Sequence, residues 1–107
     1  MIQLTKREEE VMLILWKSSN LTVNEILSYT KEANRRHYNT VSTILKVLED
    51  KKVIGHFDQG GVFRYFPNVF FYEYRKFIVD KIVDTYFNGS SYALISMAIE
   101  IKKTSHL

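Results

Sequence analysis

The sequence predicts a mainly α-helical protein with one small β-hairpin, an α+β chain in which helices dominate. Two observations lead to this prediction. Apolar residues recur at helical spacing between residues 11 and 48 and again between residues 70 and 101. Between these stretches, residues 53–67 are rich in Val, Ile, Phe and Tyr, and their period approaches the value of two that is typical of strands.

The first two helices are each introduced by a capping box, in which a Thr side chain and a Glu side chain accept each other's backbone N–H. The two pairs are Thr5 with Glu8 and Thr22 with Glu25. We expect the first helix to end near Lys17, and a short second helix to run from Val23 to about Lys31.

A polar connection, residues 31–38, precedes the third helix, which we expect to begin at Tyr38 or Asn39 and to end at Lys51. Apolar residues recur in it at i, i+3, i+4 and i+7, so they form one stripe along one side of the helix. The stripe consists of Val41, Ile44, Leu45 and Leu48.

A β-hairpin is expected next, with strands in residues 53–58 and 62–67. Gly60 and Gly61 suit the turn because they adopt positive φ without strain, and Pro67 ends the second strand. Three helices followed by a two-stranded hairpin is the order of a winged helix–turn–helix domain. The sequence therefore predicts such a domain over residues 1–67.

Residues 68–107 are expected to form two further helices, separated at Asn88-Gly89. A domain of this size cannot cover both of their apolar faces, and leftover apolar surface usually marks an association site. We therefore expect a helical dimerisation region and a homodimer; the alternative is that both helices fold back on the chain's own core. The expected dimerisation residues are Phe70, Phe71, Tyr74, Phe77, Ile78, Ile82, Tyr86, Leu94, Met97 and Ile101.

Positive charge is concentrated around the third helix. Residues 31–52 hold six Lys or Arg and three Asp or Glu, an excess that equals the net charge of +3 of the whole chain. Such clustering favours a polyanionic partner such as double-stranded DNA, although a solvated surface explains it as well.

The outer face of the third helix is predicted to read DNA bases. Short polar side chains reach base edges without holding a helix away from the major groove, so we assign base contacts to Asn39, Thr40, Ser42 and Thr43. Contacts with the DNA backbone are assigned to Arg35, Arg36, Lys46, His56 and Arg64. The alternative is that the Thr and Ser residues only cap a helix whose polar face meets water.

The sequence resembles the penicillinase-repressor family, which includes the methicillin-resistance repressor and copper-operon repressors. The likeness runs from about Leu4 to Ser90 through "LTKREEEVMLILWK", "LTVNEIL", "YNTVSTILKVLEDKKVI", "VFRYFPN" and "YFNGS". It implies a homodimeric winged-helix transcriptional repressor that binds a promoter dyad with TACA/TGTA-type half-sites. It also implies that Asn39, Thr40 and Thr43 lie at base-reading positions and that the C-terminal helices form the dimer.

The chain departs from its relatives at three points. It contains no cysteine, so the cysteine-rich metal motif of the copper repressors is missing, and we expect no metal and no cofactor. The site where β-lactam repressors are cleaved, an Asn-Phe bond, corresponds here to about Met97-Ala98, so that cleavage is not expected. The chain also ends at Leu107, before a further helix of the relatives, from which either a weaker dimer or a rearranged partner contact is expected.

Other functions fit these patterns less well. The three histidines have no i, i+4 spacing, and no phosphate-binding glycine loop or nucleophile motif occurs, so we do not expect an enzyme. Two alternatives stay open: a winged-helix module that binds protein, and a ligand-responsive regulator with a pocket between wing and dimer helices. The lack of cysteine, of a signal peptide and of a membrane-spanning run predicts a cytoplasmic protein; an upstream sensor or protease is unknown.

Overall fold

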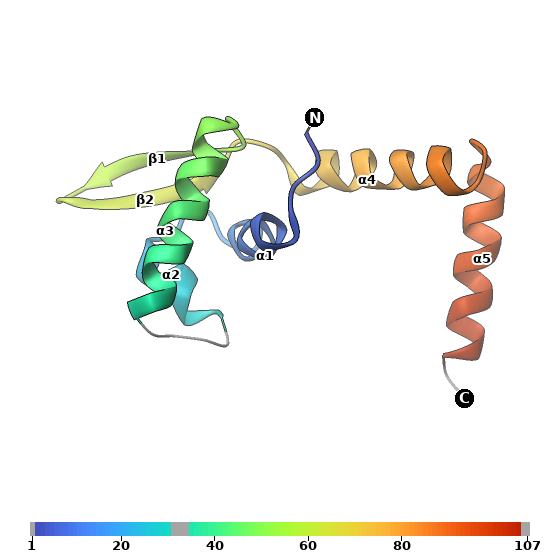
Figure 1. Cartoon of the computed structure of the whole chain (residues 1–107), viewed down its shortest axis with the longest axis horizontal. Coiled ribbons are helices and arrows are strands. Elements are labelled where there is room, and N and C mark those ends of the chain that lie inside the picture. Colours follow the sequence, from blue (N-terminus) through green and yellow to red (C-terminus); the bar gives the residue numbers. More distant parts are fainter. Residues whose placement is uncertain (1, 31–34, 106–107) are drawn as a thin grey trace. The chain divides into compact units, whose positions relative to one another are not determined.

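The computed structural model describes residues 2–30 and 35–105, except for the side chains of Arg35 and Arg36. Within these residues the chain forms five helices and one antiparallel two-stranded sheet (Figure 1). The elements are α1 (Lys6–Leu15), α2 (Val23–Ser28), α3 (Arg35–Asp50), β1 (Ile54–Gln59), β2 (Val62–Pro67), α4 (Phe71–Tyr86) and α5 (Ser91–Thr104). The predicted fold class, mainly helical with a small hairpin, is confirmed.

The chain divides into two compact units, one covering residues 2–71 and the other beginning at Tyr72. The first unit contains α1 to α3 and the hairpin, and the second contains nearly all of α4 and the whole of α5. Among the described helices, none is long and apolar enough to cross a membrane.

Both predicted capping boxes are present. Thr5 and Glu8 exchange their two hydrogen bonds at the start of α1, and Thr22 and Glu25 do the same at the start of α2. Each box satisfies backbone N–H groups that have no partner inside the helix. The capping patterns therefore located both helix starts correctly.

The ends of these two helices differ from the prediction. α1 ends at Leu15 with Trp16 as its C-cap, two residues before the expected Lys17. α2 ends at Ser28 with Tyr29 as its C-cap, whereas the end predicted near Lys31 lies outside the described residues. The N–H of Tyr29 bonds to the carbonyl of Ile26, a contact to the third preceding residue that tightens the last turn and closes the helix.

α3 is longer at its start than predicted. It begins at Arg35, so Arg35, Arg36 and His37 belong to the helix and not to a connecting loop. Arginine is a good helix former, which favours its place in the first turn. At the other end Lys52 adopts a left-handed φ of 63°, while Val53 N–H bonds to the Leu48 carbonyl at 3.1 Å and closes the helix in a Schellman motif.

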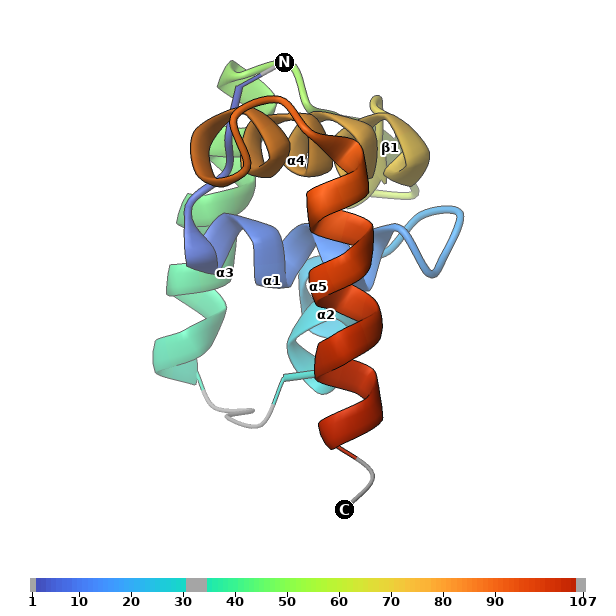
Figure 2. The ribbon, with the colours of Figure 1, turned by 90° about the vertical axis from the view of Figure 1, so that its right-hand side faces the viewer.

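The core of the first unit lies among α1, α2, α3 and the start of β1. α1 runs across α3, and α2 packs against both (Figures 1 and 2). The stripe predicted on α3 faces inward, with Val41, Leu45 and Leu48 buried and Ile44 half-buried. The largest fully buried side chains are Met12, Leu15, Ile26, Leu45, Leu48 and Ile54.

The hairpin forms the wing of the fold. Its strands pair in register from Ile54 opposite Pro67 to Gln59 opposite Val62, and a two-residue turn connects them. Gly60 and Gly61 take φ values of 62° and 88°, as the turn prediction required. The wing is also bonded to the loop before α2, because Leu21 and Tyr65 exchange two backbone hydrogen bonds of 2.9 and 2.7 Å.

The second unit consists of two helices joined by a tight turn. α4 is followed by Asn88 and Gly89, both with left-handed φ values, and Gly89 N–H bonds to the Val83 carbonyl at 3.0 Å. Ser90 caps the start of α5, since its hydroxyl accepts the N–H of Ala93 at 3.1 Å. No described residue of α5 is buried within the single chain.

Candidate nucleic-acid interface

The outer face of α3 is polar and open to solvent. Asn39, Thr43 and Lys46 are exposed, and their spacing of four and three residues places them on one side of the helix. The buried stripe occupies the opposite side. α3 is thus held in the core by its apolar side and presents short polar side chains, followed by a lysine, to solvent.

The Thr43 hydroxyl has a defined polarity. Its Oγ1 donates a hydrogen bond to the backbone carbonyl of Asn39 at 2.9 Å. The hydroxyl hydrogen is therefore used within the helix, and its lone pairs remain to accept a hydrogen bond from outside. The side chains of Thr40 and Ser42 are half-buried, and Thr40 has further interactions within the chain.

The predicted backbone-contacting residues fall into two groups. Lys46 is exposed on α3, and Arg35 and Arg36 lie in the first turn of the same helix, with side chains outside the described part of the chain. His56 and Arg64 lie on β1 and β2 of the wing, and both are engaged within the protein.

His56 connects the wing to α3. Its Nδ1 pairs with Oε1 of Glu49, and its ring lies 4.5 Å from the Phe63 ring and 5.7 Å from the Tyr65 ring, measured between centroids. Burial, together with the nearby Glu49 carboxylate and Tyr38, raises the pKa of Tyr65, so its phenol stays neutral. His56 therefore holds β1 beside α3.

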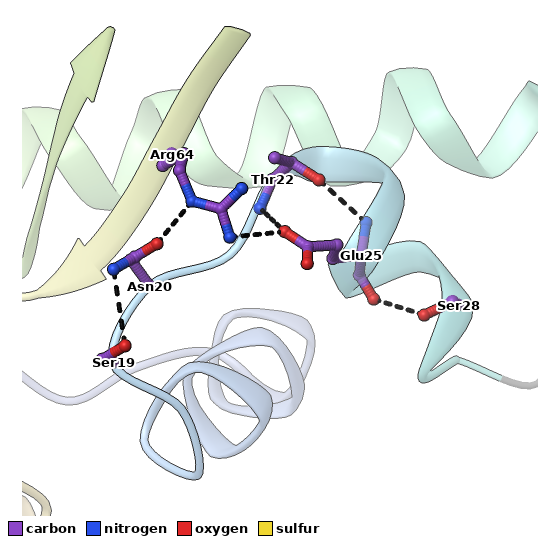
Figure 3. Close-up of polar contacts among 6 residues, drawn as sticks. All are labelled: Ser19, Asn20, Thr22, Glu25, Ser28 and Arg64. Carbon is purple, nitrogen blue, oxygen red and sulfur yellow. Dashed lines mark hydrogen bonds and ion pairs between the residues drawn. The ribbon is translucent and has the colours of Figure 1, made fainter. Parts of the chain in front are cut away.

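Arg64 connects the wing to α2 (Figure 3). Its Nη2 donates to Oε1 of Glu25 at 2.9 Å, and its Nε donates to Oδ1 of Asn20. The pKa of Glu25 is held below its usual value, chiefly by the hydrogen bond that its carboxylate accepts from the backbone N–H of Thr22. The Thr22 side chain and the Arg64 charge lower this pKa further, and together these effects outweigh desolvation, which would raise it. Arg64 therefore faces an ionised carboxylate of its own chain.

A partly buried ion pair joins the end of α3 to the start of α1. Lys51 Nζ lies 2.7 and 3.0 Å from the two carboxylate oxygens of Glu8, and the Glu8 residue is only 5% exposed. Burial alone would raise the pKa of Glu8, but the hydrogen bonds from Lys51 and Thr5 together lower it. The pair fixes the end of α3 to the start of α1.

The segment after the wing is attached to α1. The indole N–H of Trp16 donates to the Val69 carbonyl at 2.7 Å, and its ring stacks on Phe71 with centroids 5.0 Å apart. Asn68 N–H bonds to the Val53 carbonyl at 2.8 Å. The point at which the chain leaves the first unit is therefore held by side-chain and backbone contacts.

Sequence reasoning missed the partners of Arg64, Lys51 and Trp16. Arg64 and Glu25 are 39 residues apart, Lys51 and Glu8 are 43 apart, and Trp16 and Val69 are 53 apart. Helical or strand periodicity relates only near neighbours, so no local pattern contains these pairs. The one available signal was that Glu8 and Glu25 already belonged to capping boxes, which fixes where their carboxylates lie.

The predicted dimerisation residues differ widely in exposure. Tyr74 is only 3% exposed within the single chain and offers almost no surface to a partner. The ring of Phe71 stacks on Trp16, so part of its surface is already covered. Phe77, Ile78, Ile82 and Leu94 are half-buried. Phe70, Tyr86, Met97 and Ile101 are exposed, as are their neighbours Tyr72, Val79, Tyr92, Ile95 and Ile99.

The described residues contain no cluster of three or more His, Cys, Asp or Glu side chains that could hold a metal ion. Three helices with an attached hairpin, and a polar outer face on the third helix, define a winged-helix protein of the kind that places one helix in a DNA groove.

The family model described as penicillinase repressor matches residues 4–106. The chain therefore belongs to the penicillinase repressor family, whose members are DNA-binding transcriptional repressors and not enzymes. The penicillinase repressor of Bacillus licheniformis is 26% identical over 98 residues, which cover 92% of this chain and 77% of that protein. The solution structure of the DNA-binding domain of the repressor BlaI is similar with a TM-score of 0.55 and 33% identity, covering 63% of this chain and 82% of that one.

Proposed function

We propose that this repressor acts in the cytoplasm as a homodimer on a promoter dyad with TACA/TGTA-type half-sites, where it blocks access of RNA polymerase. The observation that carries the proposal is the face of α3 formed by Asn39, Thr43 and Lys46, which is polar, exposed and opposite a buried apolar stripe. A helix with this build can enter a major groove while the core holds its other side.

Base contacts are assigned to Asn39, Thr40, Ser42 and Thr43 in this proposal. The exposed Asn39 amide suits the N6 and N7 atoms of adenine. Thr43 donates its hydrogen to the Asn39 carbonyl, so it reads a base as an acceptor, from adenine N6 or cytosine N4. Adenine and cytosine, the two bases that present such a donor, both occur in a TACA half-site.

Phosphate contacts are assigned to Arg35, Arg36 and Lys46, whereas the wing residues His56 and Arg64 already have partners within the protein. The first three belong to one helix, and the segment of residues 31–52 carries the whole net positive charge of the chain. Such contacts position α3 on the duplex without reading its sequence.

Dimerisation is assigned to the second unit. Phe70, Tyr86, Met97 and Ile101 each expose more than half of their surface in the single chain. Covering large apolar side chains of this kind with a second copy is the usual reason for a two-fold dimer, and two copies would then match the two half-sites of a dyad.

The test is fluorescence anisotropy with a labelled TACA/TGTA dyad and a scrambled duplex of equal length, each at two salt concentrations. Tighter binding to the dyad, with an affinity that falls steeply with salt, is expected. Equal binding to both duplexes would contradict the assigned half-sites. No binding to either at low salt would favour the alternative of a protein-binding winged-helix module.

A further inference from the structure

The side chain of Arg64 is held between two segments that precede it in the chain by about forty residues. Its Nη2 donates to Oε1 of Glu25 and its Nε to Oδ1 of Asn20, so the edge of the guanidinium formed by these two nitrogens is occupied (Figure 3). Its side chain is only 24% exposed. Arg64 therefore lies against the protein and not out in solvent.

The carboxylate that receives Arg64 is itself fixed. Oε1 of Glu25 also accepts the backbone N–H of Thr22 at 2.9 Å, and the Thr22 hydroxyl accepts the N–H of Glu25 at 3.1 Å. Because the capping box already orients the Glu25 carboxylate, little further side-chain entropy is lost when Arg64 binds it. The ion pair is thus better placed than an ordinary surface pair between two mobile side chains.

The backbone beside Arg64 makes the same connection. The next residue, Tyr65, exchanges two hydrogen bonds with Leu21, which lies between Asn20 and Thr22. Strand β2 is therefore joined to the entry of α2 by backbone atoms at Tyr65 and by a side chain at Arg64. Both connections set the angle at which the wing leaves the helices.

A phosphate contact would compete with this arrangement. A phosphate at Arg64 would lie beside the ionised Glu25 carboxylate, which repels it, and turning the guanidinium toward DNA would break its hydrogen bonds to Glu25 and Asn20. We propose that Arg64 is a positioning residue, which fixes the wing to α2 and the loop before it, and that it does not itself bind a phosphate. This inference rests on the proposed DNA-binding function.

The test compares Arg64→Met with Lys46→Met, which removes the same charge from α3. Arg64→Met is expected to weaken dyad binding about three- to tenfold without changing the slope of log affinity against log salt. Lys46→Met, at an exposed position with an assigned phosphate contact, is expected to reduce that slope by about one unit. A slope reduced by about one unit in Arg64→Met would overturn the proposal.

Two partner variants make the sign of the effect decisive. Asn20→Ala leaves the net charge unchanged, and Glu25→Gln keeps a residue that still closes a capping box. Both are expected to weaken dyad binding, because each loosens the wing. If Arg64 binds phosphate, both changes release it toward DNA, so unchanged or tighter binding in these variants would overturn the proposal.

Amide hydrogen exchange in the DNA-free protein separates this inference from the proposed function. Residues 54–67 are expected to exchange faster in Arg64→Met and in Asn20→Ala than in the wild type, while α1 and α3 keep their protection. Unchanged wing protection in both variants would overturn the proposal even if dyad binding is confirmed. Failure of the wild type to bind either duplex would contradict the proposed function and leave this measurement valid.

Discussion

At the scale of single residues, hydrogen-bond direction and burial decide what each side chain can do. Thr43 lies at the centre of the proposed base-reading face, and its hydroxyl hydrogen is bound to the Asn39 carbonyl. Glu8 and Lys51 form an ion pair in which the carboxylate is far more buried than the ammonium group. For each arrangement we compare two substitutions, which are expected to have unequal effects on DNA binding for Thr43 and on stability for the ion pair.

Thr43→Ala is expected to weaken dyad binding by roughly 1–3 kcal/mol, because it removes a direct acceptor for one base. Thr43→Ser keeps the hydroxyl and is expected to lose much less. Anisotropy titrations with the dyad, with dyads altered at single positions and with scrambled DNA measure the difference. An equal loss on specific and scrambled DNA would show that Thr43 does not read a base.

Lys51→Met is expected to destabilise the protein more than Glu8→Gln. Removing the lysine leaves a carboxylate that is 6% exposed without its cation, at a cost of about 2–3 kcal/mol. Glu8→Gln keeps a capping box and leaves Lys51, which is 28% exposed, able to reach water, at a cost of about 1 kcal/mol. Urea unfolding followed by the fluorescence of Trp16, the single tryptophan, measures both; the reverse order would contradict the pair's assigned role.

At the scale of elements, the wing and the helix caps are the features that depend most on single positions. A Cβ added at Gly55 would lie 2.7 Å from the nearest carbon of the Phe66 ring, its partner across the strands. The Phe66 ring thus packs over the backbone of β1 at Gly55, which has no side chain. Each of the two capping boxes depends on one ionised carboxylate.

Gly55→Ala is expected to destabilise the protein by about 1–3 kcal/mol, because Phe66 must leave its position or the strands must separate. Thermal unfolding followed by circular dichroism measures the loss. Gly60→Ala is the contrasting variant: no atom lies within 4 Å of its added Cβ, and its cost comes from the positive φ of 62°. If Phe66→Leu restores stability to Gly55→Ala, the steric explanation is confirmed; an equal loss in the double variant would contradict it.

The capping boxes predict a specific sensitivity to acid. The pKa values of Glu8 and Glu25 are lowered in the folded state from an ordinary value of 4.5. A carboxylate with a lowered folded pKa contributes stability that is complete above the unfolded pKa and is lost as the pH falls through the folded one. We therefore expect the melting temperature of the wild type to decrease as the pH is lowered below about 4.5. In the Glu8→Gln, Glu25→Gln double variant this decrease is expected to be less steep.

The control for the acid experiment is Glu10→Gln, at an exposed position of α1. It is expected to follow the wild-type pH profile. An identical profile for the double variant and the wild type would show that the two carboxylates do not link folding to pH.

At the scale of the whole molecule, the two units carry two different tasks in the proposed function. The first unit encloses a core and presents a polar helix, whereas α5 has no buried residue in the single chain. α5 exposes Tyr92, Ile95, Met97, Ile99 and Ile101, a surface that a monomer would leave in water. Specific binding to a dyad should therefore depend on the second unit even though that unit reads no base.

Ile101→Asp is expected to make the protein monomeric and to weaken dyad binding by a factor of about 10² or more, because the second half-site is no longer bound intramolecularly. Sedimentation equilibrium and anisotropy measure the two effects. Ser96→Asp places the same charge among the polar residues Glu100 and Lys103 of α5 and is expected to leave the dimer intact. A wild type that sediments as a monomer would contradict the proposed homodimer.

The amino-acid sequence by itself determined the starts of α1 and α2, the hairpin turn and the buried stripe of α3. Each of these depends on residues within one or two turns of one another, such as Thr5 with Glu8 or Gly60 with Gly61. It misplaced the start of α3 because the polar composition of residues 31–38 outweighed the helix propensity of the two arginines.

Only the tertiary structure decided what the polar wing residues face. From the sequence, Arg64 and His56 were candidates for phosphate contacts, whereas the fold gives them Glu25, Asn20 and Glu49 as partners. The exposure of the predicted dimerisation residues was decided in the same way, since Tyr74 is buried and Ile101 is not. Local periodicity records which side of an element a residue occupies, but the partner on that side comes from distant parts of the chain and is known only once the elements have packed.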